Sequence, residues 1–488
     1  MIHFWLSLAM VMGAFLFWKW RRPANFPPGP WALPIIGNFL QLNYKNPLPD
    51  LEKLAKKYGN VYSIFLGNRL IVVLSGFQAV KEALVNHAAE FSDRPEDPLF
   101  VRISEKKGVI AATYGQQWKE QRRFVLMLLR NFGLGKKSME MKIQEEAKCL
   151  LNYFESRKGC QFDPKVVINN AVSNIICSIL FAQRFDYHNN TFSRQLELID
   201  ENGKLGGGIW AELYNTVPII RCLPLPFQKI FRNTSEIKGF LKKIVEEHKN
   251  TLKPGEPRDI VDCYLEEINK RRNDGSSFDE ENLRMLMFDL FVAGTDTTTN
   301  TLRWALLLMM AYPNVQENCY REIASIASGK EFVSYDDRLR MPFTHAVVHE
   351  VLRFGNIVPL GVPHSILKET SFRGYTIPRG TRVMTDLNSV LHDETQWKFP
   401  HEFNPANFLN EKGEFIKHEA FIPFSTGPRI CLGENLARME TFLFLTSLLK
   451  KFEFSWPEKS IAPNLIPRFG IVQSPYPFKV GLKGRWNN

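Results

Sequence analysis

The sequence predicts a mainly α-helical protein with small β-sheets, folded as one large domain behind an N-terminal membrane anchor. Apolar residues recur with helical periodicity over most of the chain, whereas strand-like segments are few and short. No Gly/Ser tract, long charge run or fixed-period repeat divides the 488 residues, 44% of which are hydrophobic. The chain also begins with an apolar segment that a basic cluster follows. Together these observations predict one globular core with a membrane attachment.

The apolar segment at residues 1–18 predicts the anchor. Lys19, Arg21 and Arg22 follow it directly, whereas a cleaved signal peptide carries its positive charge before the apolar stretch. The positive-inside rule keeps the residues after Arg22 in the cytosol, and about 18 apolar residues are close to the minimum that spans a bilayer. We therefore expect a transmembrane anchor at residues 1–20, a basic and proline-rich hinge at 21–38 and a globular domain at 39–488. The alternative is a helix buried within the fold.

The remaining elements follow in chain order. The proline-rich residues 27–30 cannot continue a helix and predict a stiff hinge. Residues 61–66 and 70–74, joined by Gly67-Asn68-Arg69, predict a β-hairpin. Helices are predicted at residues 78–87, 116–130, 139–156, 166–181, 192–202, 236–251, 260–272, 280–312, 315–327, 344–354 and 434–451. Strand-like pieces lie at residues 371–377, 382–386 and 470–482.

Two segments are unusual. A helix at residues 280–312 would be about 50 Å long at a rise of about 1.5 Å per residue, yet Gly294 and several threonines weaken its middle. We therefore expect that middle to have a function. Residues 209–231 are apolar but interrupted by Pro218, Pro224 and Pro226, which indicates either a contact with the bilayer or burial within the fold.

Charge and cysteine content exclude several classes of protein. A net charge of +11 suits an anionic membrane surface, an acidic partner or nucleic acid, or simply a basic cytosol-facing surface. No zinc-finger spacing or RNA-binding aromatic motif accompanies this charge, so we expect no nucleic-acid partner. The seven cysteines include no CxxC pair and are odd in number, which argues against a disulfide framework or a cysteine-based zinc site and favours a reducing compartment.

The most informative stretch is the turn-rich loop at residues 424–434, which leads into the last predicted helix. Cys431 lies just before that helix, where the free N–H groups and the helix dipole favour a thiolate. Gly427 and Gly433 allow the backbone to approach a flat ligand closely. A lone cysteine is usually a buried thiol. The pattern F-x-x-G-x-R-x-C-x-G, which runs from Phe424 to Gly433, reverses that expectation because its chance frequency is low.

This loop resembles the haem-binding loop of cytochromes P-450, and the likeness covers nearly the whole chain. The opening at residues 27–38 resembles the hinge of microsomal members, particularly those of vertebrate family 2. The resemblance implies the cytochrome P-450 fold, a single large haem domain behind a membrane anchor, and haem b (iron protoporphyrin IX) as cofactor. Cys431 would be the axial iron ligand. Further cofactor-binding residues implied by matching motifs are Arg94, Trp118, Arg122, His364, Phe424 and Arg429. Without the resemblance, core packing would explain Trp118, and a surface role would explain Arg94 and His364.

The same resemblance assigns roles within two predicted helices. In the segment Ala293–Thr298, Gly294 would leave room for dioxygen, Thr297 would contact the oxygen, and Asp296, where the family more often has Glu, would relay protons. Glu350 and Arg353 match the E-x-x-R pair that locks the haem-side core, and share a helix face as residues i and i+3. The chain departs from the family at Asn407, where Arg or His is usual, so the third charge is missing. We interpret Glu350 and Arg353 as a structural pair.

The function implied is monooxygenation of a small lipophilic substrate, with electrons from NADPH passed through FAD and FMN of an NADPH–cytochrome reductase or from a cytochrome b-type donor. Lys119, Arg123, Arg130, Lys136 and Lys137 would form the docking face for that donor, although a solvated basic face is the alternative. The implied location is the endoplasmic reticulum membrane, single-pass, with the catalytic domain on the cytosolic face. Two other functions remain open at this point, namely a haem sensor or carrier without turnover and a peroxide-rearranging haem–thiolate enzyme.

The substrate is weakly encoded. Polyunsaturated fatty acids and lipophilic foreign compounds both suit the mostly apolar pocket that the resemblance implies. Its expected lining is Phe100, Phe288, Phe291, Val292, Ala293, Ile357, Val358, Leu360 and Ile471.

Overall fold

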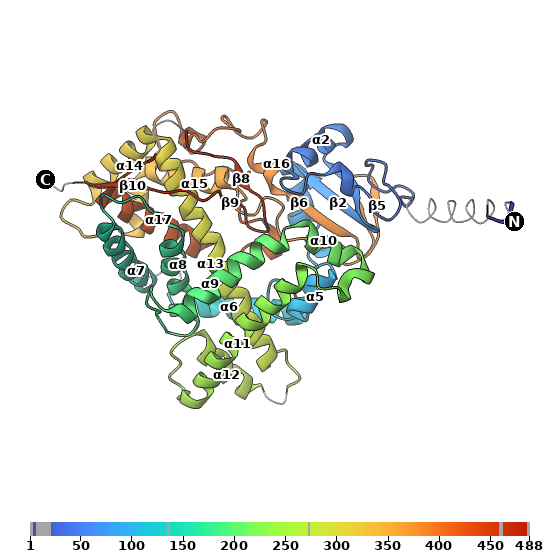
Figure 1. The fold of residues 1–488 in the computed structure, drawn as a ribbon, viewed down its shortest axis with the longest axis horizontal. Coiled ribbons are helices and arrows are strands. Elements are labelled where there is room, and N and C mark those ends of the chain that lie inside the picture. The colour runs from blue at the N-terminus through green and yellow to red at the C-terminus, as the bar shows by residue number, and fades with distance from the viewer. Residues whose placement is uncertain (1–2, 6–20, 134–136, 272–273, 458–461, 486–488) are drawn as a thin grey trace.

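The computed structural model describes residues 3–5, 21–133, 137–271, 274–457 and 462–485. The predicted anchor at residues 1–20 therefore lies, apart from residues 3–5, outside the described residues. Within the described part of the chain, no helix combines the length and the apolar character needed to cross a bilayer. The globular part is mainly helical with small sheets, as predicted (Figure 1).

Helices make up most of the described chain. They are α2 (Leu48–Tyr58), α3 (Phe77–Lys81), α4 (Ala88–Phe91), α5 (Pro98–Ser104), α6 (Gln116–Asn131), α7 (Lys137–Ser156), α8 (Lys165–Leu180), α9 (Asn190–Gly206), α10 (Ile209–Thr216), α11 (Phe227–Thr251), α12 (Ile260–Lys270), α13 (Glu280–Ala311), α14 (Pro313–Ile326), α15 (Pro342–Gly355), α16 (Leu387–Leu391) and α17 (Glu434–Lys451). Shorter turns of 3-10 helix lie at η1 (Phe39–Gln41), η3 (Pro218–Cys222), η4 (Tyr335–Arg340), η5 (Pro405–Phe408) and η6 (Gly427–Arg429), and η2 (Glu82–Asn86) is a π-helical turn.

Four small sheets accompany these helices in the described residues. The largest has the strand order β1-β2-β6-β3, formed by β1 (Val61–Leu66), β2 (Arg69–Ser75), β6 (Arg382–Asp386) and β3 (His364–Ser365). β1 and β2 form the predicted antiparallel hairpin, whereas β2 and β6 are parallel and pair Ile71 with Arg382. The two-stranded sheets are β4 (Thr370–Phe372) with β5 (Tyr375–Ile377), β7 (Phe452–Ser455) with β10 (Gly481–Gly484), and β8 (Pro467–Arg468) with β9 (Ser474–Pro475).

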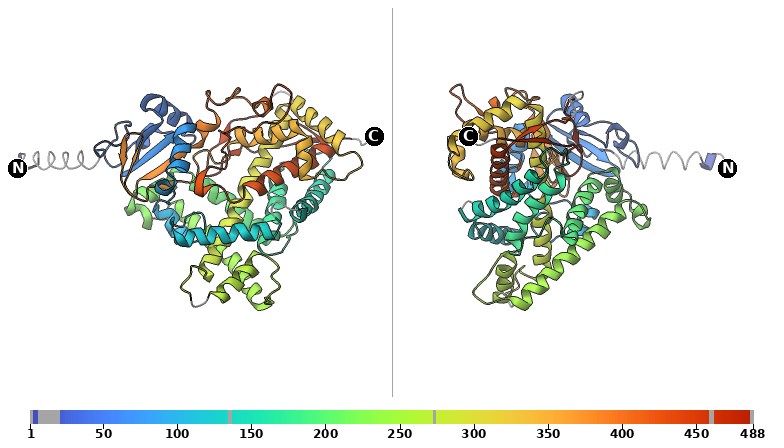
Figure 2. Two further views of the ribbon diagram at one scale, coloured as in Figure 1. Left: turned by 180° about the vertical axis from the view of Figure 1, so that it is seen from behind. Right: turned by 60° about the vertical axis from the view of Figure 1, so that its left-hand side comes forward.

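Helix α13 runs through the middle of the helical part and organises the core (Figures 1 and 2). Asp279 caps its first turn by accepting a hydrogen bond from Asn282 N. Apolar residues on all its sides pack against neighbouring helices, and this pattern is typical of a helix buried within a large protein. The largest core cluster joins it to α7, α8, α14, α15 and α17. The weakened middle of α13 therefore lies at the centre of the fold.

Several elements differ from the prediction. The predicted helix at 78–87 is split into α3 and the π-turn η2, and α11 begins at Phe227 rather than at residue 236. α2, α5 and β7 were not predicted, because α2 buries only Leu48 and Leu51 and the other two are short. The predicted strand at residues 470–482 is wrong as a continuous strand, since only β9 and the start of β10 are extended there.

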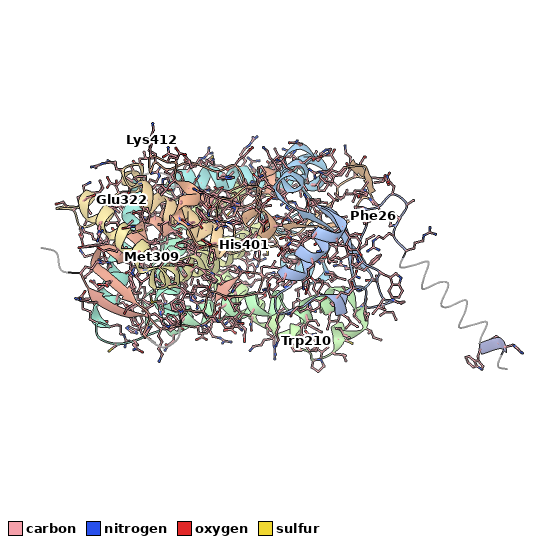
Figure 3. The ribbon with its side chains drawn as sticks, turned by 90° about the horizontal axis from the view of Figure 1, so that it is seen from above. Phe26, Trp210, Met309, Glu322, His401 and Lys412 are labelled. Atoms are coloured by element: carbon pink, nitrogen blue, oxygen red, sulfur yellow. The ribbon has the colours of Figure 1, made fainter. Side chains whose placement is uncertain are left out.

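The apolar segment at residues 209–231 is partly buried and partly exposed, and its contact with the bilayer stays a prediction. Tyr214, Phe227 and Ile230 are buried in a small cluster that ties α10 and the start of α11 to α5. Ile219 is 80% exposed, and Ile209, Trp210 and Leu223 are also exposed. Trp210 lies at the edge of the molecule in Figure 3. One face of the segment is thus core, and the other presents apolar side chains to the surroundings.

Candidate functional site

The loop that carries Cys431 is held in place by backbone contacts. Cys431 N donates a hydrogen bond to Phe424 O over 3.1 Å. Gly427 has a φ of 77°, and a Cβ there would lie 2.0 Å from Leu84 O, so only glycine fits. The loop then leads through Gly433 into α17, whose first-turn amides point back toward the sulfur.

The Cys431 thiol lies deep within the fold and is nevertheless accessible. Burial raises its pKa above the ordinary value, while the backbone N–H groups of Gly433 and Glu434 and the Arg122 guanidinium act in the opposite direction. Cys431 is also exposed by its accessible area. A side chain that is both deep and accessible lines a space inside the molecule. The predicted influence of the helix N-terminus is present, and burial opposes it.

Three arginines near this loop form a cationic cluster, in which Arg429 is buried and Arg94 and Arg122 are half-buried. Arg429 donates hydrogen bonds to the carbonyl oxygens of Ser92, Val109 and Ala112, and its guanidinium lies 4.0 Å from the centre of the Trp118 ring. Burial, reinforced by the neighbouring Arg94, lowers the pKa of Arg429 to about 8.

Arg94 and Arg122 have the same kind of partner. Arg94 donates to the carbonyl oxygens of Ile110, Val362 and Pro363, and burial lowers its pKa to about 10. Arg122 donates to Ile430 O in the cysteine loop. No ion pair to any of these three arginines occurs among the described residues.

Trp118 and His364 lie beside the cluster, and each has a hydrogen-bond partner within the protein. Trp118 Nε1 donates to Val109 O over 3.0 Å, so its N–H has a protein partner, and the predicted contact with a propionate remains a prediction. His364 Nδ1 lies 2.7 Å from Phe91 O. Burial, together with Arg94 and Arg429, holds the pKa of His364 well below its usual range.

These residues fit haem on grounds of charge. Buried cations without carboxylate partners are costly, and two propionates would supply the missing negative charge. The sulfur of Cys431, an iron ligand when deprotonated, lies in the loop whose Ile430 carbonyl binds Arg122. The Cys431 sulfur and the three arginines thus come together from the cysteine loop, α6 and the segment between α4 and α5.

The middle of α13 contributes the second half of the site. Ala293 is exposed although most of α13 is buried, so it too borders internal space. Thr297 Oγ1 donates to Ala293 O over 2.7 Å, and Thr301 Oγ1 donates to Thr297 O over 3.0 Å. Such bonds from threonine to the carbonyl one turn earlier weaken and bend a helix. The threonines that looked unfavourable in the sequence therefore form a distortion that borders the site.

Gly294 has a packing role that the sequence did not indicate. A Cβ on Gly294 would lie 2.5 Å from Ile176 Cδ1 of α8. Its missing side chain therefore lets α8 and α13 pack closely, and the predicted room for dioxygen stays a prediction. Ala293, the accessible neighbour, is the small residue that faces the internal space.

Asp296 is an acid whose environment suits proton transfer. Its Oδ1 accepts a hydrogen bond from Asn300 Nδ2 over 2.9 Å. Burial, with a contribution from Asp200, raises the pKa of Asp296 to about 6. A carboxyl group with such a pKa exchanges its proton near neutral pH.

Two hydrogen bonds join segments that carry predicted pocket residues, and the assignment of these residues to a pocket stays a prediction, with one exception. Gln473 N donates to Ile357 O over 2.7 Å, and Ile471 N donates to Gly203 O over 3.3 Å, so three distant segments meet. Phe100, Val292, Val358 and Leu360 are half-buried and Phe288 is buried, whereas Ile471 is 42% exposed.

The exception is Phe291. Its ring packs among the rings of Phe181, Phe192 and Phe240 and is fully buried. It therefore belongs to the interface between helices and is removed from the predicted pocket.

Sequence reasoning missed Asp289, which shapes the same region. Its Oδ2 accepts hydrogen bonds from Val109 N over 2.8 Å and from Ile110 N over 2.9 Å. The segment that supplies Arg429 with two carbonyl partners is thereby fixed to α13. A lone acid within the apolar run Phe288-Asp289-Leu290 was the available signal.

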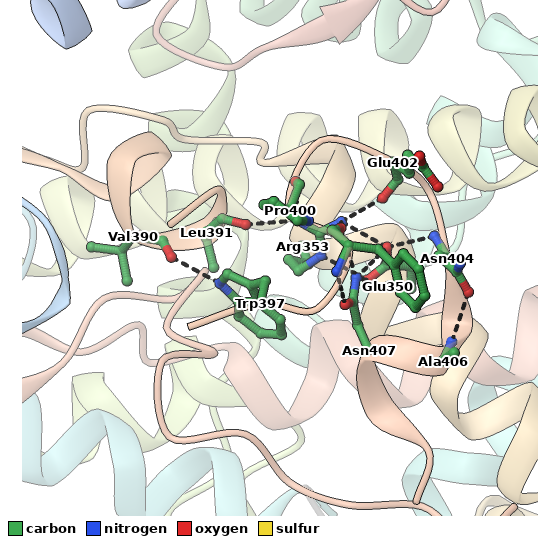
Figure 4. A network of polar contacts seen from close by, with 11 residues as sticks. Glu350, Arg353, Val390, Leu391, Trp397, Pro400, Glu402, Asn404, Ala406 and Asn407 are labelled. Carbon is green, nitrogen blue, oxygen red and sulfur yellow. Dashed lines mark hydrogen bonds and ion pairs between the residues drawn. The ribbon is translucent and has the colours of Figure 1, made fainter. Parts of the chain in front are cut away.

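Glu350 and Arg353 form the predicted structural pair, and both are fully buried (Figure 4). Arg353 Nε and one terminal nitrogen donate to the two carboxylate oxygens, each over 2.7 Å. Arg353 also donates to the carbonyl oxygens of Leu391, Pro400, Phe399 and Glu402. One arginine thus fixes a long loop onto α15.

Asn407 replaces the missing third charge by hydrogen bonding. Its Nδ2 donates to Glu350 Oε1 over 3.2 Å and to Phe399 O over 3.1 Å, and its Oδ1 accepts from Phe399 N over 2.9 Å (Figure 4). Asn404 N also donates to Glu350 Oε1, over 2.8 Å. The group therefore contains one buried negative charge and one buried positive charge, in balance.

Part of the predicted docking face surrounds a hollow beside the cysteine loop. The hollow has a volume of about 500 Å³ and is lined by Tyr114, Trp118, Lys119, Arg122, Arg123, Leu126, Met127, Arg130, Asn131 and Pro428. Lys119, Arg123 and Arg130 line this hollow, and Lys137 begins α7; their role in docking stays a prediction. Lys136 lies outside the described residues.

Comparison with known proteins gives matches over nearly the whole chain. The family model for cytochrome P450 matches residues 27–482. Cytochrome P450 2J2 of Homo sapiens is 46% identical over 461 residues, covering 94% of this chain and 91% of the relative. Cytochrome P450 2J5 of Mus musculus is 45% identical over 478 residues (97% and 95%), and cytochrome P450 2F2 of Rattus norvegicus is 41% identical over 483 residues (98% and 98%). The similarity therefore extends far beyond the Cys431 loop.

Proposed function

The chain belongs to the cytochrome P450 family and is similar to its family 2 members, and from this premise we propose that it is a membrane-anchored haem–thiolate monooxygenase. It would insert one oxygen atom of O2 into a lipophilic substrate and release the other as water. That reaction consumes two electrons, which NADPH would supply through a flavoprotein reductase, and two protons. The observation that carries the proposal is Cys431, a deep but accessible sulfur beside three arginines that have no carboxylate partner among the described residues.

The proposed cofactor-binding residues would contact different parts of haem b. Cys431 would ligate the iron as a thiolate, and the amides of Gly433 and Glu434 would stabilise the negative sulfur. Arg94, Trp118, Arg122, His364 and Arg429 would hold the propionates. When bound, the haem would supply a metal centre that binds and reduces dioxygen, with the thiolate donating electron density to it.

Asp296 and Thr297 would deliver the protons that the reaction consumes. Burial raises the pKa of the Asp296 carboxyl group to about 6. Asp296 neighbours Thr297, whose hydroxyl borders the internal space. This pair favours monooxygenation over a sensor or carrier, and over an enzyme that rearranges peroxides. Neither alternative needs a proton to be delivered from solvent.

We further propose a lipophilic substrate, either a polyunsaturated fatty acid or a foreign compound. The lining residues Phe100, Phe288, Val292, Ile357 and Val358 are apolar, and such a surface binds a substrate mainly by excluding water. Residues 1–20 would anchor the protein in the endoplasmic reticulum membrane with the catalytic domain on the cytosolic face. The hollow near Pro428 would receive the reductase, or a cytochrome b-type donor, through its basic rim.

Replacement of Cys431 tests the proposed function. Cys431→His should give at best a haem protein whose reduced carbon monoxide complex lacks the red-shifted Soret band, because imidazole donates less electron density than a thiolate. Cys431→Ala should bind haem poorly, since no axial bond remains. Neither variant should oxygenate substrate with NADPH and reductase. Cys160→Ser, which changes an exposed cysteine elsewhere, is the matched control and should keep the band. Retention of the band by Cys431→Ala would overturn the assignment.

The substrate class can be narrowed with the intact protein. Binding of fatty acids, steroids and drug-like amines would be followed by the difference spectrum of the haem. A response confined to amines that ligate the iron directly would contradict the lipophilic pocket, whereas a response to fatty acids would support it.

A further inference from the structure

A cluster of charged side chains lies beside Asp296, and the proposed function assigns no role to these side chains. Lys165 Nζ of α8 lies 2.7 Å from Asp200 Oδ2 of α9, and Lys204 pairs with the same carboxylate from the next turn. The side chains of Lys165 and Asp200 are 28% and 22% exposed, and that of Lys204 is 40% exposed. This group, called the Asp200 cluster below, therefore reaches solvent.

The Asp200 cluster approaches Asp296 because α9 carries a glycine at the point of contact. Asp200 and Gly203 are three residues apart and share a face of α9. A Cβ on Gly203 would lie 3.3 Å from Asp296 Oδ2. The Asp296 carboxyl group thus lies against the backbone of α9, one helical turn from the Asp200 carboxylate, with no side chain at position 203 between them.

The Asp296 carboxyl group is held in this position from its own helix. Asn300 Nδ2 donates to Asp296 Oδ1 over 2.9 Å, and a terminal nitrogen of Arg303 donates to Asn300 Oδ1 over 2.9 Å. The hydrogen bond from Asn300 uses Oδ1, while Oδ2 is the atom that faces Gly203. One carboxyl oxygen is therefore fixed by α13, and the other faces α9 and its charged group.

We propose that Asp200 is the solvent-side end of the proton path to Asp296, with its lysine partners outside the path, and that Asn300 is a positioning residue for the Asp296 carboxyl group. The inference rests on the proposed function, since it supplies the protons that monooxygenation consumes. After Asp296 gives its proton toward Thr297, its carboxylate takes up a proton from bulk water that passes through Asp200. Asp200 then returns to its charged form, and no other bond changes.

The charges around Asp296 support proton transfer inward, from Asp200 to Asp296. Burial raises the pKa of Asp296 first and the negative Asp200 raises it further, while Lys165 of α8 and Arg303 of α13 lower it. Lys165 and Lys204 lower the pKa of Asp200 despite its burial. A proton is therefore held more firmly by Asp296 than by Asp200. The remaining charged groups, Asp163 and Arg468, act on Arg303.

Two variants of the same ion pair separate a proton path from a structural contact. Asp200→Asn and Lys165→Gln each break the pair between α8 and α9. Asp200→Asn removes a negative neighbour and should lower the pKa of Asp296, whereas Lys165→Gln removes a positive neighbour and should raise it. Infrared titration of the protonated carboxyl band measures this pKa, and the band is identified by its loss in Asp296→Asn.

Turnover provides the second measurement. With reductase and NADPH, Asp200→Asn should divert several-fold more reducing equivalents to peroxide and increase the solvent deuterium isotope effect on product formation. Lys165→Gln should leave product per NADPH near the wild-type value. Glu201→Gln is the matched control, because Glu201 pairs with Lys229 of α11 from the adjacent position of α9.

Asn300→Leu tests the positioning role. It should uncouple turnover, and Asn300→Gln should recover part of the lost product per NADPH by restoring an amide donor.

The outcomes distinguish this inference from the proposed function. Equal uncoupling by Asp200→Asn and Lys165→Gln, with pKa shifts in the same direction, would reduce the cluster to a contact between helices. Wild-type coupling in Asp200→Asn, while Asp296→Asn uncouples, would overturn the path and leave the proposed function intact. Wild-type coupling in Asp296→Asn itself would overturn the proposed function of that acid. Failure of Asn300→Gln to recover coupling, with a wild-type carboxyl band in Asn300→Leu, would remove the positioning role.

Discussion

Replacing Asn407 with alanine tests how a buried carboxylate is compensated without a third charge. The Asn407 amide donates to the Glu350 carboxylate and to Phe399 O, and accepts from Phe399 N. A hydrogen bond to a charged group contributes about 1.5–3 kcal/mol, and a buried polar group left unpaired costs about 1–3 kcal/mol. Because contributions within one network do not add, we expect Asn407→Ala to lower the free energy of unfolding by about 3–4 kcal/mol.

The expected change is measurable by heat and by denaturant. The unfolding entropy is about 2.1 cal/mol/K per residue, so for 488 residues each kcal/mol corresponds to a shift of about 1 °C in Tm. Asn407→Ala should therefore lower Tm by about 3–4 °C. Urea unfolding of the haem-loaded protein, followed by tryptophan fluorescence and by circular dichroism, gives the free energy where the two transitions coincide.

Two further variants separate charge from size. Asn407→Asp keeps the size of the side chain but places a second carboxylate against Glu350, so at neutral pH it should cost more than alanine. Asn404→Ala keeps the bond from Asn404 N to Glu350 and removes only the side-chain bond to Ala406 N. It should cost about 1 kcal/mol. A free energy for Asn407→Ala within about 0.5 kcal/mol of wild type, or an Asp variant more stable than the Ala variant, would refute the reasoning.

Two other changes test the site and the membrane contact. Thr297→Ala should retain haem and ligand binding but divert reducing equivalents to peroxide or water, and Asp296→Asn should slow proton delivery in the same step; NADPH consumption still matched to product in both variants would remove these roles. Deletion of residues 1–20, which keeps the Arg22 hydrogen bond to Ser63 Oγ, should leave a haem-loaded domain that partly associates with membranes through Ile209, Trp210, Ile219 and Leu223. Recovery of the truncated protein entirely in the soluble fraction without detergent would show that this second contact is wrong.

Features set by local sequence were predictable. The long central helix follows from continuous periodicity, and its polar middle marked the site before any contact was known. The Cys431 loop was recognisable because its glycines, arginine and cysteine occupy fixed spacings. Glu350 and Arg353 pair within one helix face, so their contact needs no tertiary information.

Features set by distant partners were not predictable. The role of Gly294 depends on Ile176, a residue of another helix, and nothing near Gly294 in the chain indicates that contact. Phe291 is an apolar aromatic residue of the kind that lines a lipophilic pocket, but it packs in an aromatic cluster instead. The pKa of Cys431 could not be inferred from its helix N-terminus, because the burial that outweighs the nearby amides comes from the whole fold.

The pairing of β2 with β6 has a consequence for how the protein reaches its native state. Ile71 meets Arg382, so this sheet forms only after most of the chain has been synthesised. Until then the β1–β2 hairpin has an open edge lined by Ile71, Val72, Val73 and Leu74, all fully buried in the finished protein. Unpaired apolar edges invite association with other chains, and contacts between distant residues slow folding. A ribosome-bound intermediate would therefore expose an aggregation-prone strand, which must be shielded during translation until β6 has been synthesised and pairs with β2.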